Sequence, residues 1–109
     1  MIECREDVRI PIELPVLFAA IGQIDLRQGT MFDISTGGCA VISPVSVKPG
    51  TGLKLLIRAA DLGSQINIQS AEVRWASHGE FGVEFMDLTD VDRSRLHRLL
   101  SLATQRPAP

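Results

Sequence analysis

The chain has 109 residues, the size of a single domain, and its apolar content of 45% is ordinary for a globular protein. Its 11 basic and 13 acidic residues give a formal net charge of −2, which argues against a DNA-binding surface because such surfaces usually carry a basic excess. No apolar run is long enough to span a membrane, and no signal peptide is visible. We therefore expect a cytoplasmic protein, or a cytoplasmic domain of a larger protein, with no direct membrane insertion.

The first elements in chain order are an arm and a strand. Residues 1–9 are polar and lack periodicity, so they are expected to form a flexible arm. From Ile10 to Val16 apolar residues alternate with proline and glutamate, which predicts a half-buried strand that continues to about Ala20. The chain then turns at Gly22.

The same alternation, broken by glycine and proline, predicts five more strands. Their expected ranges are 28–35, 39–42, 53–60, 65–76 and 81–85. A shift in the alternation at Gln69-Ser70 indicates a β-bulge in the fifth strand. Residues 36–38 are expected to form a tight turn through positive φ at glycine, and residues 61–64 and 77–80 form the other short turns.

A helix is expected after Leu88, where the period changes from two to about 3.6. Thr89 can cap it, with Asp92 as the acidic partner three positions later. Its apolar face is expected to comprise Val91, Leu96, Leu99, Leu100 and Ala103. The predicted fold is therefore mainly β, a six-stranded antiparallel barrel with a C-terminal α-helix, since closure removes exposed strand edges. The expected divisions are an arm (1–9), the barrel and helix (10–104) and a frayed tail (105–109).

Two polar motifs carry the chemistry. Arg5 and Arg9 form an R-x-x-x-R pair, and arginine can fork onto a phosphate or onto guanine O6 and N7, or stack on a base. Asp33, Ser35 and the glycines follow as D-I-S-T-G-G. A carboxylate can accept the N1–H and N2–H donors of guanine, and a serine hydroxyl can bond to a base or phosphate. Gly37 and Gly38 would let a ligand approach the backbone.

The motif R-x-x-x-R followed by D-x-S-x-x-G resembles the signature of the PilZ domain, the bacterial receptor module for cyclic di-GMP. Arg5 and Arg9 match its first part, and Asp33, Ser35 and Gly38 match its second. The resemblance extends over nearly the whole chain and implies a Greek-key barrel. It implies cyclic di-GMP as the ligand, bound by Arg5, Arg9, Asp33, Ser35, Gly37 and Gly38, with no other cofactor.

The expected mechanism is that a ligand touching both motifs docks the arm onto the barrel and alters contact with a downstream protein, possible examples being motility or exopolysaccharide machinery. The alternative is a PilZ-like adaptor that acts by protein contact with weak or no nucleotide binding. Whether the protein forms a homodimer is also left open by the sequence. Cys4 stands where the family often has arginine or an apolar residue, so the number of bound nucleotides is open as well.

Other classes of function have less support in the sequence. No catalytic arrangement or metal cluster is visible, so we expect neither an enzyme nor a metal site. An oligonucleotide-binding barrel is disfavoured by the low aromatic content of 5%. Trp75 is expected in the core or at the barrel rim, with a place near the ligand as the alternative. Arg74, His78 and His97 are expected at the surface, and a redox link between Cys4 and Cys39 is the less favoured reading of the cysteines.

Overall fold

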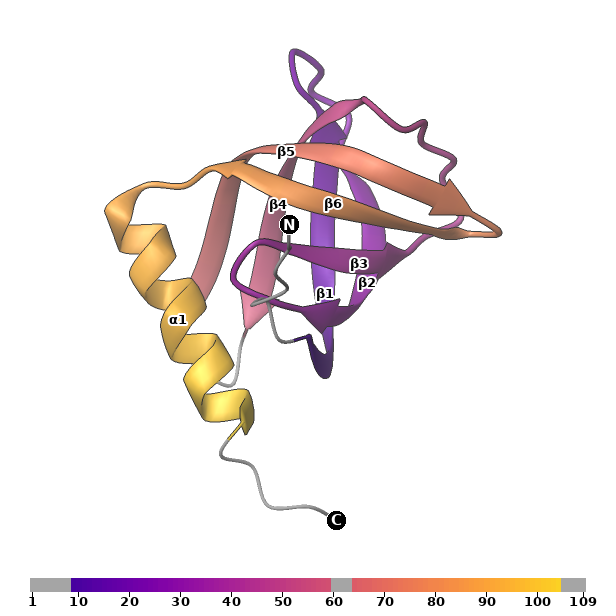
Figure 1. Ribbon diagram of the computed structural model, residues 1–109. Coiled ribbons are helices and arrows are strands. Elements are labelled where there is room, and N and C mark those ends of the chain that lie inside the picture. Colours follow the sequence, from indigo (N-terminus) through magenta and orange to yellow (C-terminus); the bar gives the residue numbers. More distant parts are fainter. Residues whose placement is uncertain (1–8, 60–63, 105–109) are drawn as a thin grey trace, which may run out of the picture.

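The computed structural model describes residues 9–59 and 64–104. They form six strands and one helix, shown in Figure 1. The elements are β1 (Ile10–Ala20), β2 (Arg27–Ile34), β3 (Gly38–Ile42), β4 (Gly52–Ala59), β5 (Ser64–Ser77), β6 (Glu80–Asp87) and α1 (Asp90–Thr104). The predicted elements are all confirmed, with boundaries that differ by a few residues. The predicted turn at 61–64 lies mostly outside the described residues.

The strands close into a barrel in the order β1-β2-β3-β6-β5-β4, and every neighbouring pair is antiparallel. Closure occurs because β1 pairs with both β2 and β4. The connection from β3 to β4 passes two intervening strands, β6 and β5, which is the Greek-key arrangement. The predicted fold class is therefore confirmed.

Bulges bend the strands enough to close the sheet. Gln69 and Ser70 together oppose the single residue Lys54, which confirms the bulge predicted there. A second bulge in β5 inserts Arg74 between the pairs Val73–Val83 and Trp75–Gly82. The extra residue interrupts the alternation of side chains, so Trp75 points outward instead of following Val73 into the core.

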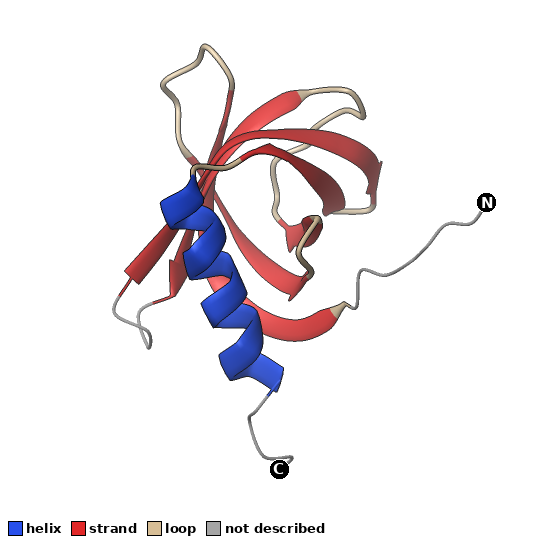
Figure 2. Ribbon diagram, turned by 60° about the vertical axis from the view of Figure 1, so that its left-hand side comes forward, coloured by secondary structure: helices blue, strands red, loops and turns tan. Residues whose placement is uncertain are grey.

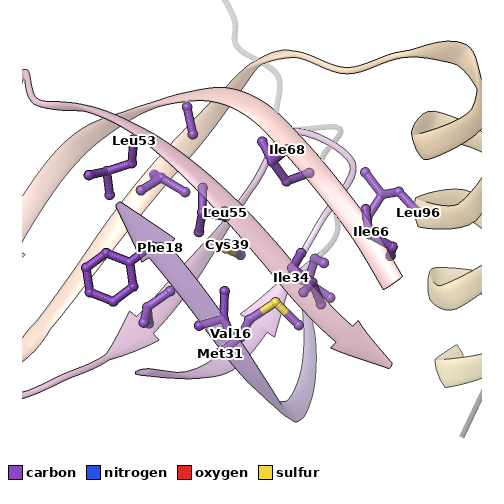
Figure 3. Close-up of a cluster of buried hydrophobic side chains, with 14 of the residues drawn as sticks. Val16, Phe18, Met31, Ile34, Cys39, Leu53, Leu55, Ile66, Ile68 and Leu96 are labelled. Atoms are coloured by element: carbon purple, nitrogen blue, oxygen red, sulfur yellow. The ribbon is translucent and has the colours of Figure 1, made fainter. Parts of the chain in front are cut away.

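The barrel interior is filled by apolar side chains from all six strands. Figure 3 shows part of this core. Phe18 and Phe81 meet edge to face with ring centroids 5.2 Å apart. The β5–β6 hairpin is tight because His78 and Gly79 both adopt positive φ, as a type I′ turn requires. His78 and His97 are both exposed, as the sequence predicts.

Helix α1 packs along one side of the barrel, mainly against β5 (Figure 2). Leu96, Leu99 and Leu100 are buried against the barrel core, whereas the prediction that Val91 shares this face is wrong. Val91 is exposed, and the buried residue of the first turn is Asp92. Its carboxylate accepts hydrogen bonds from the Asn67 amide and the Thr89 hydroxyl, both at 2.9 Å. The predicted cap is thus confirmed, and Asp92 also ties the helix to β5.

Candidate functional site

Arg9 and Asp33 meet at the edge of the barrel where β1 begins. The β1–β2 register pairs Ile10 with Ile34 and Pro11 with Asp33, which brings Arg9 alongside the end of β2. Arg9 Nη1 donates to Asp33 Oδ1 at 2.9 Å. Both side chains remain partly exposed, so a ligand can reach the pair. The barrel topology therefore joins two residues that are 24 positions apart in the sequence.

The Ser35–Gly38 segment forms the turn from β2 to β3 and is held by its own hydrogen bonds. The Ser35 amide donates to the Gly38 carbonyl at 2.9 Å, and the Gly37 amide donates to Ser35 Oγ at 3.2 Å. Ser35 is buried, and its hydroxyl also lies 3.4 Å from the Gly38 carbonyl oxygen. The structure thus uses Ser35 to shape the turn, and its predicted contact with a base or phosphate stays a prediction.

Gly38 serves a purpose in this turn that the sequence did not predict. Positive φ among the described glycines occurs at Gly22, Gly50 and Gly79, so the expected positive φ at residues 36–38 is wrong. At Gly38 a side chain would collide with the carbonyl oxygen of Val83 on β6. Close approach of two strands is therefore the structural reason for glycine at this position.

A cleft of about 200 Å³ lies on the outer surface between these motifs and β5–β6. It is lined by Arg9, Ser35, Gly37, Gly38, Arg74, Trp75, Gly82, Val83 and Glu84. Two larger hollows, of about 350 and 430 Å³, lie elsewhere on the barrel. Of these three hollows, the smaller cleft is the one that brings Arg9 and the Ser35–Gly38 turn together with an aromatic ring, so we take it as the candidate ligand site.

Trp75 and Arg74 are cleft residues that the predicted site did not include. The Trp75 ring covers Gly82, where a side chain would strike the indole nitrogen, and 41% of Trp75 is exposed. Arg74 is exposed, as the sequence predicts, and it is also paired: its Nε donates to Glu84 at 2.7 Å and its Nη1 lies 3.7 Å from Glu72. The signal for both residues is the bulge that turns Trp75 outward, and alternation alone could not reveal it.

Comparison with known proteins gives the family. The family model described as PilZ domain matches residues 3–102. The chain belongs to the PilZ domain family. The resemblance inferred from the two motifs is thus confirmed. No curated protein sequence matches this PilZ domain significantly.

Several solved structures share the fold. The PilZ domain of Escherichia coli YcgR with c-di-GMP has a TM-score of 0.77 at 12% identity, covering 94% of this chain and 93% of that one. The PilZ domain of CeSA from a cellulose-synthesizing bacterium has a TM-score of 0.69 at 22% identity, covering 87% and 97%. The Bacillus subtilis inhibitor of motility, MotI/DgrA, has a TM-score of 0.74 at 22% identity, covering 97% of this chain. This PilZ domain spans 55% of the MotI chain.

The structure leaves some expected site features unplaced. Arg5, most of the arm and Cys4 lie outside the described residues. Arg9, Asp33, Ser35, Gly37 and Gly38 do gather around one edge of the PilZ barrel. Across residues 9–59 and 64–104, no group of three or more potential metal ligands occurs. No helix in this part of the chain is long and apolar enough to cross a membrane.

Substituting Gly82→Ala is expected to displace the Trp75 ring from the cleft wall. The new methyl group would occupy the space of the indole nitrogen, and the ring is free to swing outward because its far side is exposed. Trp75 is the sole tryptophan of the chain, so intrinsic fluorescence reports on it directly. We expect a red-shifted emission maximum with little change in the circular dichroism spectrum. Gly52→Ala, which adds the same methyl group in β4, is the control, and unchanged emission of the Gly82 variant would contradict the packing.

Cys39 is buried in the PilZ core directly after the site turn. Burial, and to a lesser extent the Asp33 carboxylate, raises the pKa of the Cys39 thiol to about 12, while Arg9 acts in the opposite direction. The thiol therefore stays neutral and enclosed in the folded protein, where a disulfide partner could not reach it without local opening.

The free energy of unfolding is expected to fall as the pH rises above about 8.5. The Cys39 thiol of the unfolded chain ionises near that pH, whereas the folded thiol holds its proton up to about pH 12. The folded state then binds more protons, so stability falls by up to about 1.4 kcal/mol per pH unit in this window. Urea unfolding of wild type and Cys39→Ala between about pH 8 and pH 10 measures the effect. Parallel loss of stability in both proteins would rule out Cys39 as its source.

Proposed function

We propose that this PilZ domain is a receptor for cyclic di-GMP and that the ligand binds across the cleft beside the Arg9–Asp33 pair. The observation that carries the proposal is the junction of this pair with the Ser35–Gly38 turn and the exposed face of Trp75. It places a planar cation, a carboxylate and an aromatic surface within one ligand's span. The structure of YcgR in complex with c-di-GMP has the same fold and supports this assignment.

The chemistry of cyclic di-GMP fits these groups. Among the described residues, the contact between Arg9 and Asp33 uses only the Nη1 group of the guanidinium. The other donors of Arg9 are therefore left for a phosphate or for guanine O6 and N7. The second oxygen of Asp33 can accept from the guanine N1–H and N2–H edge. Trp75 offers an exposed face on which a purine can stack. Because the cleft holds only about 200 Å³, most of a dinucleotide would remain outside it, available to further contacts.

Those further contacts are assigned to the arm. Arg5 precedes Arg9 by four residues, so a ligand bound beside Arg9 lies within reach of a second arginine. Fixing each backbone residue of the arm costs roughly 1–2 kcal/mol, which charge-assisted hydrogen bonds of roughly 1.5–3 kcal/mol each can offset. In this proposal the ligand concentration sets whether the arm is docked, and the docked arm changes contact with a downstream protein. Motility or polysaccharide machinery are the candidates, since MotI is an inhibitor of motility and CeSA comes from a cellulose-synthesizing bacterium.

Titration calorimetry with cyclic di-GMP tests the proposal. We expect heat at tens of micromolar ligand or below, and the stoichiometry will show whether one nucleotide or a stacked pair binds. Cyclic di-AMP is the matched control ligand because it keeps both phosphates but lacks the guanine O6 acceptor and N1–H donor. Absence of heat with cyclic di-GMP would overturn the assignment. Equal heats with cyclic di-GMP and cyclic di-AMP would mean that the protein recognises the phosphates and not the guanine bases.

The second candidate is an adaptor that acts through protein contact with weak nucleotide binding. The observation that favours it is the charge on the β5–β6 side of the cleft. Arg74 is bonded to Glu84 and lies near Glu72, so two carboxylates surround one arginine and oppose an approaching phosphate. An adaptor would retain partner binding after Arg9→Ala, whereas a receptor would lose its nucleotide response. Size-exclusion chromatography with and without ligand would test the possible homodimer.

A further inference from the structure

The loop between β1 and β2 exposes an unusual amount of apolar surface. It comprises residues 21–26 and stands clear of the barrel in Figure 1. Three aliphatic side chains lie on it, with exposed fractions of 50% for Ile21, 94% for Ile24 and 64% for Leu26. Nothing in the barrel core or the candidate ligand site uses them, because Arg9 lies at the opposite end of β1.

The base of this loop is held by backbone hydrogen bonds. The Gln23 amide donates to the Ala20 carbonyl at 2.9 Å, and the Ile21 amide donates to the Gly52 carbonyl at 3.0 Å. Gly22 adopts a φ of 90°, which lets the chain turn directly after β1. The fold therefore presents the aliphatic tip at a defined position on the barrel.

Basic side chains lie near the base of this loop. Arg27 and Lys48 line a hollow of about 430 Å³ between the β1–β2 and β3–β4 loops, with Asp25 as the one acidic residue on its wall. Lys54 is exposed on β4 beside the end of β1. Within the described residues, none of these three cations forms an ion pair. This end of the barrel is thus locally basic, although the whole chain has a net charge of −2.

We propose that the β1–β2 loop docks this domain onto an anionic lipid bilayer. Ile24 and Leu26 enter the headgroup boundary, and Arg27, Lys48 and Lys54 contact lipid phosphates. A bilayer fits better than a protein pocket because the tip projects from the barrel and the long cations near its base can extend toward headgroups. Shallow insertion needs no membrane-spanning segment, so it revises only the expectation of no direct membrane insertion.

Vesicle co-sedimentation of the full chain tests this proposal. The probe is phosphatidylcholine vesicles with about 30% phosphatidylglycerol, compared with phosphatidylcholine alone. We expect binding to the anionic vesicles that weakens as salt is raised. Ile24→Ser with Leu26→Ser is expected to lower the bound fraction about tenfold. The matched control is Val91→Ser with Leu102→Ser, which removes two exposed aliphatic side chains from α1 and should leave binding unchanged.

A second pair of variants separates the charge contribution. Arg27→Gln with Lys48→Gln is expected to reduce binding severalfold, whereas Arg93→Gln with Arg98→Gln on the exposed side of α1 should not. All four double variants change exposed side chains, and thermal melting checks that each is folded. Failure to bind anionic vesicles, or equal loss in the control variants, would overturn the proposal. A dimer that disappears on the Ile24 and Leu26 substitutions, without vesicle binding, would instead assign the loop to a second copy of the chain.

Discussion

Replacing Arg9 with alanine is expected to weaken cyclic di-GMP binding by at least roughly a hundredfold while leaving the fold intact. The loss follows from the role proposed for the guanidinium, since two charge-assisted hydrogen bonds of roughly 1.5–3 kcal/mol each would disappear. Stability should change by less than about 1 kcal/mol, because the Arg9–Asp33 pair is partly exposed and such ion pairs contribute little. Calorimetric titration and urea unfolding of the same preparation measure both quantities.

Two control variants sharpen this experiment. Arg9→Lys retains the positive charge but not the planar fork of donors, so an affinity between those of wild type and the alanine variant would show that geometry contributes beyond charge. Arg98→Ala removes an exposed cation of α1 and should bind normally. If Arg9→Ala binds cyclic di-GMP as wild type does, the ligand does not use this end of the barrel.

Substituting Gly38→Ala is expected to destabilise the protein by about 3 kcal/mol, even without ligand. The added methyl group would overlap the Val83 carbonyl oxygen, and relief requires β3 and β6 to separate at the point where the Phe85 amide bonds the Gly37 carbonyl at 2.8 Å. A fall in melting temperature of at least about 10 °C should result.

The control is Gly52→Ala, also a strand glycine without positive φ. There the new methyl group meets the tip of the Ile21 side chain at 3.1 Å, which can shift with little cost. Its melting temperature should stay within a few degrees of wild type. If Gly38→Ala were as stable as wild type but failed to bind cyclic di-GMP, Gly38 would serve ligand approach, as the sequence suggests, and not strand packing.

Much of the fold follows from local patterns. The alternation from Ile10 to Val16, the change of period after Leu88 and the cap formed by Thr89 and Asp92 each depend on neighbouring residues, so they can be read from the sequence. Val91 was misassigned because helical spacing alone places it near the apolar face. Burial of Asp92 depends on the Asn67 amide, which only the packing of α1 on β5 supplies.

The candidate site divides in the same way. The two sequence motifs identify five described residues as candidates, and the barrel brings them to one edge. They are Arg9, Asp33, Ser35, Gly37 and Gly38. Trp75 could not be assigned to the cleft from the sequence, because simple alternation places it on the same side as Val73. The bulge at Arg74 turns the Trp75 side chain to the opposite side of the strand, and bulges depend on how the strands pair.

By itself, the sequence determined the order of the elements, the family and the residue types available to a ligand, because periodicity, turns and short motifs are local properties. The tertiary structure alone decided which of these residues meet. The β1–β2 register joins Arg9 to Asp33, close strand packing requires glycine at position 38, and a bulge turns Trp75 toward the cleft. It also places the aliphatic β1–β2 loop among cations at the far end of β1. Each of these depends on how strands pair with their neighbours in the barrel, which register and curvature set.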